Sequence, residues 1–170
     1  MNTLRIQFTP GQELGMSKGE AKALLFGHLR ISVYSDSATE IRSVIEMQLA
    51  YRELATWLRN NRSAILNETI PIGESGSSSI AEAVARFYHQ LNPENENVEL
   101  SERLYTYRVS HGIRFGQRGT DIPDVYIGLF GGVYEVSFCG ESEKWRYEVN
   151  LPKFLEEANR LFEESRYLVS

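Results

Sequence analysis

The most regular alternation of apolar and polar residues in this sequence lies between Val125 and Phe138. Two alternating runs flank Gly131 and Gly132, and such a pair is typical of the two-residue turn of a β-hairpin. The turn sets Phe130 opposite Val133, and side chains alternate between the two faces of each strand. One face therefore carries Val125, Ile127, Leu129, Tyr134, Val136 and Phe138, and the other carries Asp124, Tyr126, Gly128, Phe130, Val133, Glu135 and Ser137.

Shorter alternating stretches predict further strands at residues 3–8, 29–34, 104–109 and 145–149. Elsewhere apolar residues recur at the helical period, which predicts helices at 45–60, 80–91 and 152–162. Ser79 and Glu82 form a capping box at the start of the second helix, and Asn150 caps the third. The acidic stretch at 92–102 is typical of a solvated linker.

Together these elements predict one α+β domain over residues 1–170, with an antiparallel sheet of about five or six strands and about three helices. The hairpin is central, and the last helix is expected to cover its apolar face. The polar segment 73–79, GESGSSS, is a candidate join between two subdomains, 1–72 and 80–170. If the helix at 80–91 leaves the mixed face open, Tyr126 and Phe130 form an exposed patch that a partner can bind.

Composition narrows the classes of function. A single cysteine, Cys139, excludes an intrachain disulfide and a thiolate zinc cluster, and no nucleotide or dinucleotide fingerprint indicates a cofactor. No apolar run approaches the ~20 residues of a membrane-spanning helix, and the first residues do not resemble a signal peptide. We therefore expect a cytoplasmic protein without a membrane partner. The net charge of -5 disfavours nucleic acid as the main partner.

The least generic stretch is SHGIRFGQRGTDIPD, residues 110–124, a polar, glycine-rich entry to the hairpin. Functional residues favour loops that rigid strands position. We therefore predict a binding site formed by His111, Arg114, Arg118, Asp121 and Asp124, together with Tyr126 and Phe130 on the mixed face. A connector whose glycines supply positive φ angles is the structural alternative.

Two catalytic hypotheses for this region meet geometric objections. Asp124 and Glu135 match the carboxylates of a PD-(D/E)xK nuclease, but the hairpin register separates them by ~13 Å, and Ser137 replaces the lysine. A hydrolase built on Ser110 and His111 is disfavoured because neighbouring side chains of a strand point to opposite faces. We assign no catalytic residue and no metal ligand, and the sequence favours a protein that is not an enzyme.

Residues 111–138 resemble a segment of uncharacterised bacterial proteins associated with ImmA/IrrE-type metallopeptidases. The matching positions are His111, Arg114, Gly119, Pro123, Asp124, Ser137 and Phe138. The peptidase motif HExxH is absent from this chain. The resemblance therefore implies an accessory or recognition region of bacterial defence or stress systems, without peptidase chemistry.

The sequence thus favours a non-enzymatic bacterial protein-binding module, with an immunity protein or an antiviral defence component as the specific hypothesis. Its acidic residues would meet a basic surface of a toxin or nuclease, and a homodimer stays open. The first alternative is a small-ligand or nucleotide sensor that uses the same loop. A metal-dependent nuclease or another hydrolase with a degenerate motif ranks third.

Overall fold

The protein is described by a computed structural model that covers residues 1–11, 17, 19, 25–91, 97–117 and 120–167. Its elements, in chain order, are β1 (Thr3–Pro10), β2 (Phe26–Tyr34), β3 (Glu40–Ala50), α2 (Tyr51–Asn60), α3 (Arg62–Asn67), α4 (Ile80–Gln90), α5 (Val98–His111), the 3-10 helix η2 (Ile113–Gly116), β4 (Tyr126–Phe130), β5 (Val133–Cys139), β6 (Lys144–Glu148) and α6 (Leu151–Tyr167). The α+β class is confirmed. The expected single sheet with about three helices is wrong in detail, because the described residues form two three-stranded antiparallel sheets and five α-helices.

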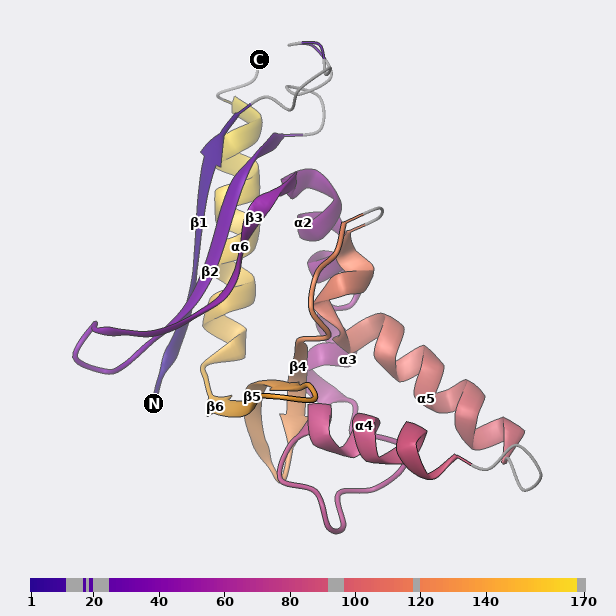
Figure 1. Cartoon of the computed structure of the whole chain (residues 1–170). Helices are drawn as coiled ribbons and strands as arrows, with labels where there is room; N and C mark the ends of the chain where they lie inside the picture. Colours follow the sequence, from indigo (N-terminus) through magenta and orange to yellow (C-terminus); the bar gives the residue numbers. More distant parts are fainter. Residues whose placement is uncertain (12–16, 18, 20–24, 92–96, 118–119, 168–170) are drawn as a thin grey trace.

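The first sheet has the order β1–β2–β3, and α6 runs along it (Figure 1). We expected α6 to cover the hairpin, but it packs chiefly on β1 and α2. The cause lies at the start of the helix, where Val149 forms a parallel bridge with Asn2 beside β1 and Asn150 donates its backbone N–H to the carbonyl of Asn2 at 3.1 Å. These contacts direct the chain toward the first sheet.

Two predicted elements have the wrong type or bounds. The helix predicted at 45–60 begins only at Tyr51, because residues 45–50 pair with β2 and complete β3. The strand predicted at 104–109 lies inside α5, which begins in the stretch expected to be a linker. There the Asn97 side chain accepts the N–H of Leu100 at 3.1 Å and caps the helix. Tertiary pairing thus overrides the helical spacing of residues 45–50, and the helix that Asn97 caps overrides the alternation of residues 104–109.

The second sheet confirms the hairpin. Phe130 pairs with Val133 and Ile127 with Val136, as the turn predicts, and β6 adds the third strand beside β5. Gly131 and Gly132 have φ angles of 60° and 79°, which a two-residue turn with both central residues at positive φ requires. Local turn chemistry therefore fixes this register.

The mixed face of the hairpin is covered rather than open. Helix α4 begins at the predicted Ser79 cap, which accepts the N–H of Glu82 at 3.1 Å, and packs on β4 and β5. Tyr126 and Phe130 are only 2% and 5% exposed, in a cluster with Ile80 and other α4 side chains. The expectation of an exposed patch at Tyr126 and Phe130 is therefore wrong.

The main core takes side chains from both predicted subdomains. Leu54 and Ile65 come from the first part of the chain, and Ile113 and Phe154 come from the second. All four are fully buried. The role of segment 73–79 as a join between subdomains stays a prediction.

A buried carboxylate holds α4 on the second sheet. Glu135 on β5 has no exposed surface, and one of its oxygens accepts the backbone N–H of Ile80 at 2.8 Å. Arg146 on β6 donates to the other oxygen, and the nearby Ser137 hydroxyl oxygen accepts the N–H of Ala81 at 3.2 Å. The first N–H groups of a helix have no partner within it and carry partial positive charge. Glu135 supplies the complementary negative charge from inside the protein.

We expect Glu135→Ala to lower the free energy of unfolding by about 3 kcal/mol, because it leaves Arg146 and the α4 N-terminus without their partner. The matched control is Glu143→Ala, whose carboxylate pairs with Arg42 at 2.6 Å while its side chain is 50% exposed. Glu143→Ala should lower the free energy of unfolding by no more than ~1 kcal/mol. Urea denaturation of both variants measures the difference, and equal losses would contradict an anchoring role for Glu135.

Candidate functional site

The six described residues of the predicted site do not share one surface. Arg118 lies outside the described residues. Asp121 is exposed and forms no ion pair with another described residue, whereas His111, Tyr126 and Phe130 are buried. Arg114 of η2 donates to Asp124 at 2.8 Å. Of the predicted residues, Arg114 and Asp124 therefore form a pair near the surface, and the buried Tyr126 lies two positions along the chain from Asp124.

The residue that connects them is Arg108, near the end of α5. Its Nε donates to the Tyr126 hydroxyl at 3.0 Å, and its Nη2 lies 3.7 Å from a carboxylate oxygen of Asp124. The guanidinium lies 4.8 Å from the centre of the Tyr88 ring and 6.0 Å from that of Phe115, within cation–π range. Burial lowers the pKa of Arg108, but hydrogen bonds to Tyr88 and Tyr126 more than offset this and raise it above its ordinary value.

Helix α5 holds Arg108 in place because its end is anchored on two sides. The indole N–H of Trp57 on α2 donates to the carbonyl of Val109 at 2.8 Å, and Gly112 forms a bridge with Tyr126 on β4. Next to this anchor, the rings of Tyr105 and Phe115 pack edge to face, with their centres 6.3 Å apart. We call the resulting cluster the arginine–aromatic surface; it consists of Tyr88, Tyr105, Arg108, Arg114, Phe115 and Asp124.

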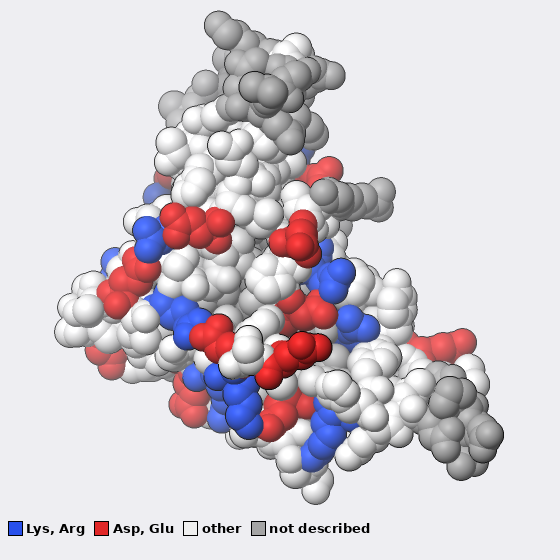
Figure 2. Space-filling model, in the orientation of Figure 1, with Lys and Arg blue, Asp and Glu red and all other residues white. Residues whose placement is uncertain are grey.

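This surface has the composition of a binding interface. The Tyr88 and Tyr105 side chains are 40% and 57% exposed, and Tyr and Arg are enriched at interface hot spots. Figure 2 shows one face of the molecule, on which acidic and basic residues are interspersed rather than gathered by sign. Among the described residues, the face drawn in Figure 2 carries no large field of one sign.

A cleft of 420 Å³ opens between α4, the end of α5 and the second sheet. One wall is apolar and comes from α4, with Ala81, Val84 and Ala85. The other lining residues are Tyr88, His89, Arg108, Asp124, Tyr126 and Cys139. We call this hollow the Arg108 cleft. It places the thiol and the guanidinium within one partly enclosed space.

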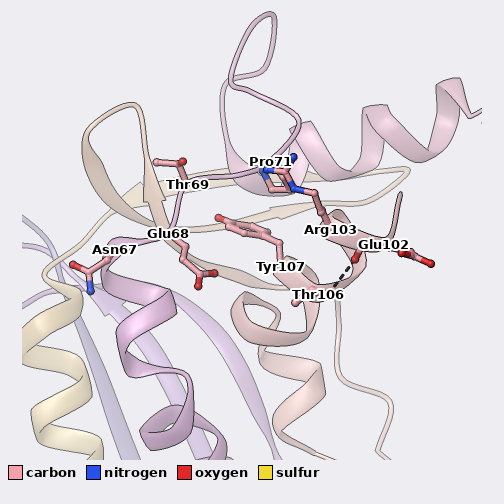
Figure 3. A pocket seen from close by; sticks show the side chains of 8 residues that line it. All are labelled: Asn67, Glu68, Thr69, Pro71, Glu102, Arg103, Thr106 and Tyr107. Atoms are coloured by element: carbon pink, nitrogen blue, oxygen red, sulfur yellow. Dashed lines mark hydrogen bonds between the residues drawn. The ribbon is translucent and has the colours of Figure 1, made fainter. Parts of the chain in front are cut away.

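A larger hollow of 630 Å³ lies on the other flank of α5, between that helix and residues 67–71 (Figure 3). It is lined by Asn67, Glu68, Thr69, Pro71, Glu102, Arg103, Thr106 and Tyr107. In Figure 3 the Tyr107 ring lies across the hollow between Arg103 and Glu68, and its buried hydroxyl has no hydrogen-bond partner among the described residues. We call this hollow the α5 groove.

His111 is a structural residue rather than a loop residue. It ends α5, stacks on Tyr107 with ring centres 3.7 Å apart, and places Nε2 3.2 Å from the carbonyl of Ala64 on α3. Burial lowers its pKa to about 4, so at neutral pH the ring is uncharged and donates one N–H. A Cβ atom at Gly128 would lie 2.7 Å from the His111 ring, so β4 also packs closely against it.

The geometric objection to a Ser110–His111 pair is wrong. The two residues share a helix rather than a strand, so the hydroxyl lies 2.9 Å from Nδ1. The pair is instead disfavoured by burial, because the two residues are only 9% and 0% exposed. Glu135 is engaged by Ile80 and Arg146, away from Asp124. Within the ranges that the structure describes, no group of three His, Cys, Asp or Glu side chains is placed to hold a metal ion.

The chain matches no protein-family model, no curated protein and no solved structure. The resemblance of residues 111–138 to bacterial defence-associated proteins therefore stays a prediction. Among the described helices, none combines the length and the apolar character that crossing a membrane requires.

Sequence reasoning missed Arg108, Tyr88, Tyr105 and Phe115. The signal was present, because Leu104, Tyr107 and His111 recur at helical spacing after the potential cap Asn97. A helix assigned there places Tyr105 and Arg108 three residues apart, as neighbours on one face. Assigning a strand instead hid that pairing.

The burial of His111 predicts a loss of stability in acid. Its folded pKa of about 4 lies below the ordinary value of 6.5, so the unfolded chain binds the extra proton first. The stabilisation present above pH 6.5 is lost as the pH falls toward 4, by about 3 kcal/mol in total. Urea denaturation from pH 7.5 to 4 should show this loss in the wild type and a smaller one in His111→Gln, which retains an N–H donor toward Ala64.

The comparison with His111→Gln isolates the histidine. Burial raises the pKa of Glu135, so that group favours the folded state increasingly as the pH falls, but it does so in both proteins. Parallel pH profiles for the two proteins would contradict the assignment.

Proposed function

We propose that this chain is a non-enzymatic protein-binding module that recognises its partner through the arginine–aromatic surface. The observation that supports this most is the exposure of Tyr88 and Tyr105 beside Arg108 and Arg114. Large rigid rings give much contact area for little loss of side-chain freedom, and arginine is enriched at interface hot spots. Hydrolysis at the same place is disfavoured because Ser110 and His111 are buried and a substrate does not reach them.

The form of α5 adds support. Among the large apolar side chains that are most exposed in the described residues, Tyr88, Val98 and Tyr105 lie on α4 and α5. Figure 1 shows α5 extending away from the first sheet, so that its first half stands clear of the main core. A projecting helix with exposed apolar side chains is a common recognition element.

For the partner, we propose a toxin or another defence component, with this chain as an immunity protein or defence-system component of a bacterium. This rests on the resemblance of residues 111–138 and on the acidic balance of the whole chain, with a net charge of -5. The charge favours encounter with a basic partner, while the arginine–aromatic surface provides the contact.

The second candidate function is a sensor of a small ligand, and the α5 groove favours it. Its volume of 630 Å³ is within the usual range of ligand sites, ~300–1,000 Å³. Glu68, Glu102 and Arg103 form no ion pair within the described part of the chain, so their charges are free to meet a ligand that bears both signs.

The test compares two double variants in affinity capture from a lysate of the source organism, followed by mass spectrometry. Tyr105→Ala/Arg114→Ala should lower capture of a stoichiometric protein partner at least tenfold, because it removes an exposed ring and a guanidinium from the surface. The control, Ile41→Ala/Arg52→Ala, removes an exposed apolar residue and an exposed arginine elsewhere and should capture the partner like the wild type.

Capture that both variants reduce equally would overturn the assignment of the surface. A purified protein that binds no partner but retains a small molecule in native mass spectrometry would favour the sensor. In that case Arg103→Ala, in the α5 groove, should release the molecule, whereas the Tyr105→Ala/Arg114→Ala variant should retain it.

A further inference from the structure

We propose that the Arg108 cleft binds the C-terminal carboxylate of a partner chain that ends in an apolar residue. This inference rests on the proposed protein-binding function and names the chemistry of the group recognised. Its support is the balance of charge around Asp124, which lines the cleft and also pairs with Arg114 outside it, together with the hydrogen-bond donors of Arg108 and the apolar α4 residues that line the same space.

The charges around Asp124 do not balance. Arg114 binds this carboxylate at 2.8 Å, and Arg108 lies 3.7 Å from its other oxygen. Two guanidinium groups thus share one carboxylate, which leaves one positive charge uncompensated within the cluster. A carboxylate from another chain supplies that missing charge, even though the protein as a whole is acidic.

Hydrogen-bond donors are available at the same point. Arg108 donates to the Tyr126 hydroxyl through Nε and also interacts with Tyr88. Its Nη2 lies 3.7 Å from Asp124, which is too long for a hydrogen bond, so this nitrogen has a donor to offer. The Tyr126 hydroxyl oxygen accepts from Arg108, so its own hydrogen can be donated. A guanidinium within cation–π range of the Tyr88 and Phe115 rings and hydrogen-bonded to Tyr126 is already oriented, which lowers the entropic cost of binding a carboxylate.

The opposite wall decides between the sources of a carboxylate. Ala81, Val84 and Ala85 of α4 line the same 420 Å³ space. Ala81 and Val84 are only 2% and 4% exposed, so the apolar area is small and suits a single side chain. A chain-terminal residue presents its carboxylate and its side chain from one Cα atom, so it can meet both walls at once. An Asp or Glu side chain brings a carboxylate without an apolar group beside it, which leaves the α4 wall unused.

The test is a titration of the 15N-labelled full chain, followed by backbone amide shifts. The probes are N-acetyl-L-valine, its neutral amide, and N-acetyl-L-aspartic acid α-amide, which carries only a side-chain carboxylate. N-acetyl-L-valine should bind in the millimolar range and shift amides of residues 81–85 and Tyr126. The neutral amide and the aspartic acid derivative should each bind at least tenfold more weakly.

Two variants test the chemistry, and a third is the control. Arg108→Lys keeps the positive charge but loses the planar fork of the guanidinium. It should weaken the binding of N-acetyl-L-valine about tenfold. Asp124→Asn removes the carboxylate that competes for Arg108. It should strengthen the binding of N-acetyl-L-valine severalfold, because the Asp124 carboxylate would repel the carboxylate of the probe. Arg52→Lys, at an exposed position on α2 that does not line the cleft, should leave the binding of N-acetyl-L-valine unchanged. Dispersed amide signals before titration show that each variant is folded.

Equal binding of N-acetyl-L-valine and its amide, or weaker binding by Asp124→Asn, would overturn the proposal. Stronger binding of the aspartic acid derivative would instead assign the cleft to acidic side chains and overturn the choice of a chain terminus. The two proposals fail separately: Tyr105→Ala/Arg114→Ala tests partner capture, whereas these small probes test the cleft without any partner.

Discussion

The contact between the Glu135 carboxylate and the first turn of α4 is the interaction on which the rest of the second sheet depends. It satisfies the N–H of Ile80 at 2.8 Å in a place that water does not reach. A helix end buried without such a partner leaves N–H groups unsatisfied at substantial cost. By fixing the start of α4 on β5, Glu135 lets the helix cover Tyr126 and Phe130 and carries Tyr88, at the far end, to Arg108.

Much of the fold was predictable wherever a local signal met no competitor. The Gly131-Gly132 turn, the Ser79 cap and the Asn150 cap all act within a few residues, and the structure confirms each of them. The errors fall where a distant partner decides. Residues 45–50 have apolar spacing that suits a helix, but Leu29 and Ile31 of β2 pair with Met47 and Ile45. A single sequence does not reveal such a pairing.

The candidate site was predictable only in part, for a related reason. The turn-rich segment before the hairpin led to Arg114 and Asp124, which the structure pairs near the surface at 2.8 Å. Their role in binding stays a prediction. Placing Tyr126 and Phe130 at the surface required knowing whether α4 covers that face. The contact that decides this joins Glu135 to Ile80, 55 positions apart in the chain. Arg108 was hidden because the alternation in residues 104–109 also suits a strand.

Stability alone gives little reason for two arginines around one carboxylate. An exposed pair such as Arg114 and Asp124 contributes only ~0–1 kcal/mol. Arg108, with its side chain 19% exposed, has lost much of its hydration, and an apolar side chain of similar size often packs at such a place without loss of stability. Yet the fold orients this guanidinium with Tyr88, Phe115 and Tyr126. An oriented cation with surplus charge is what recognition of an acceptor outside the chain requires.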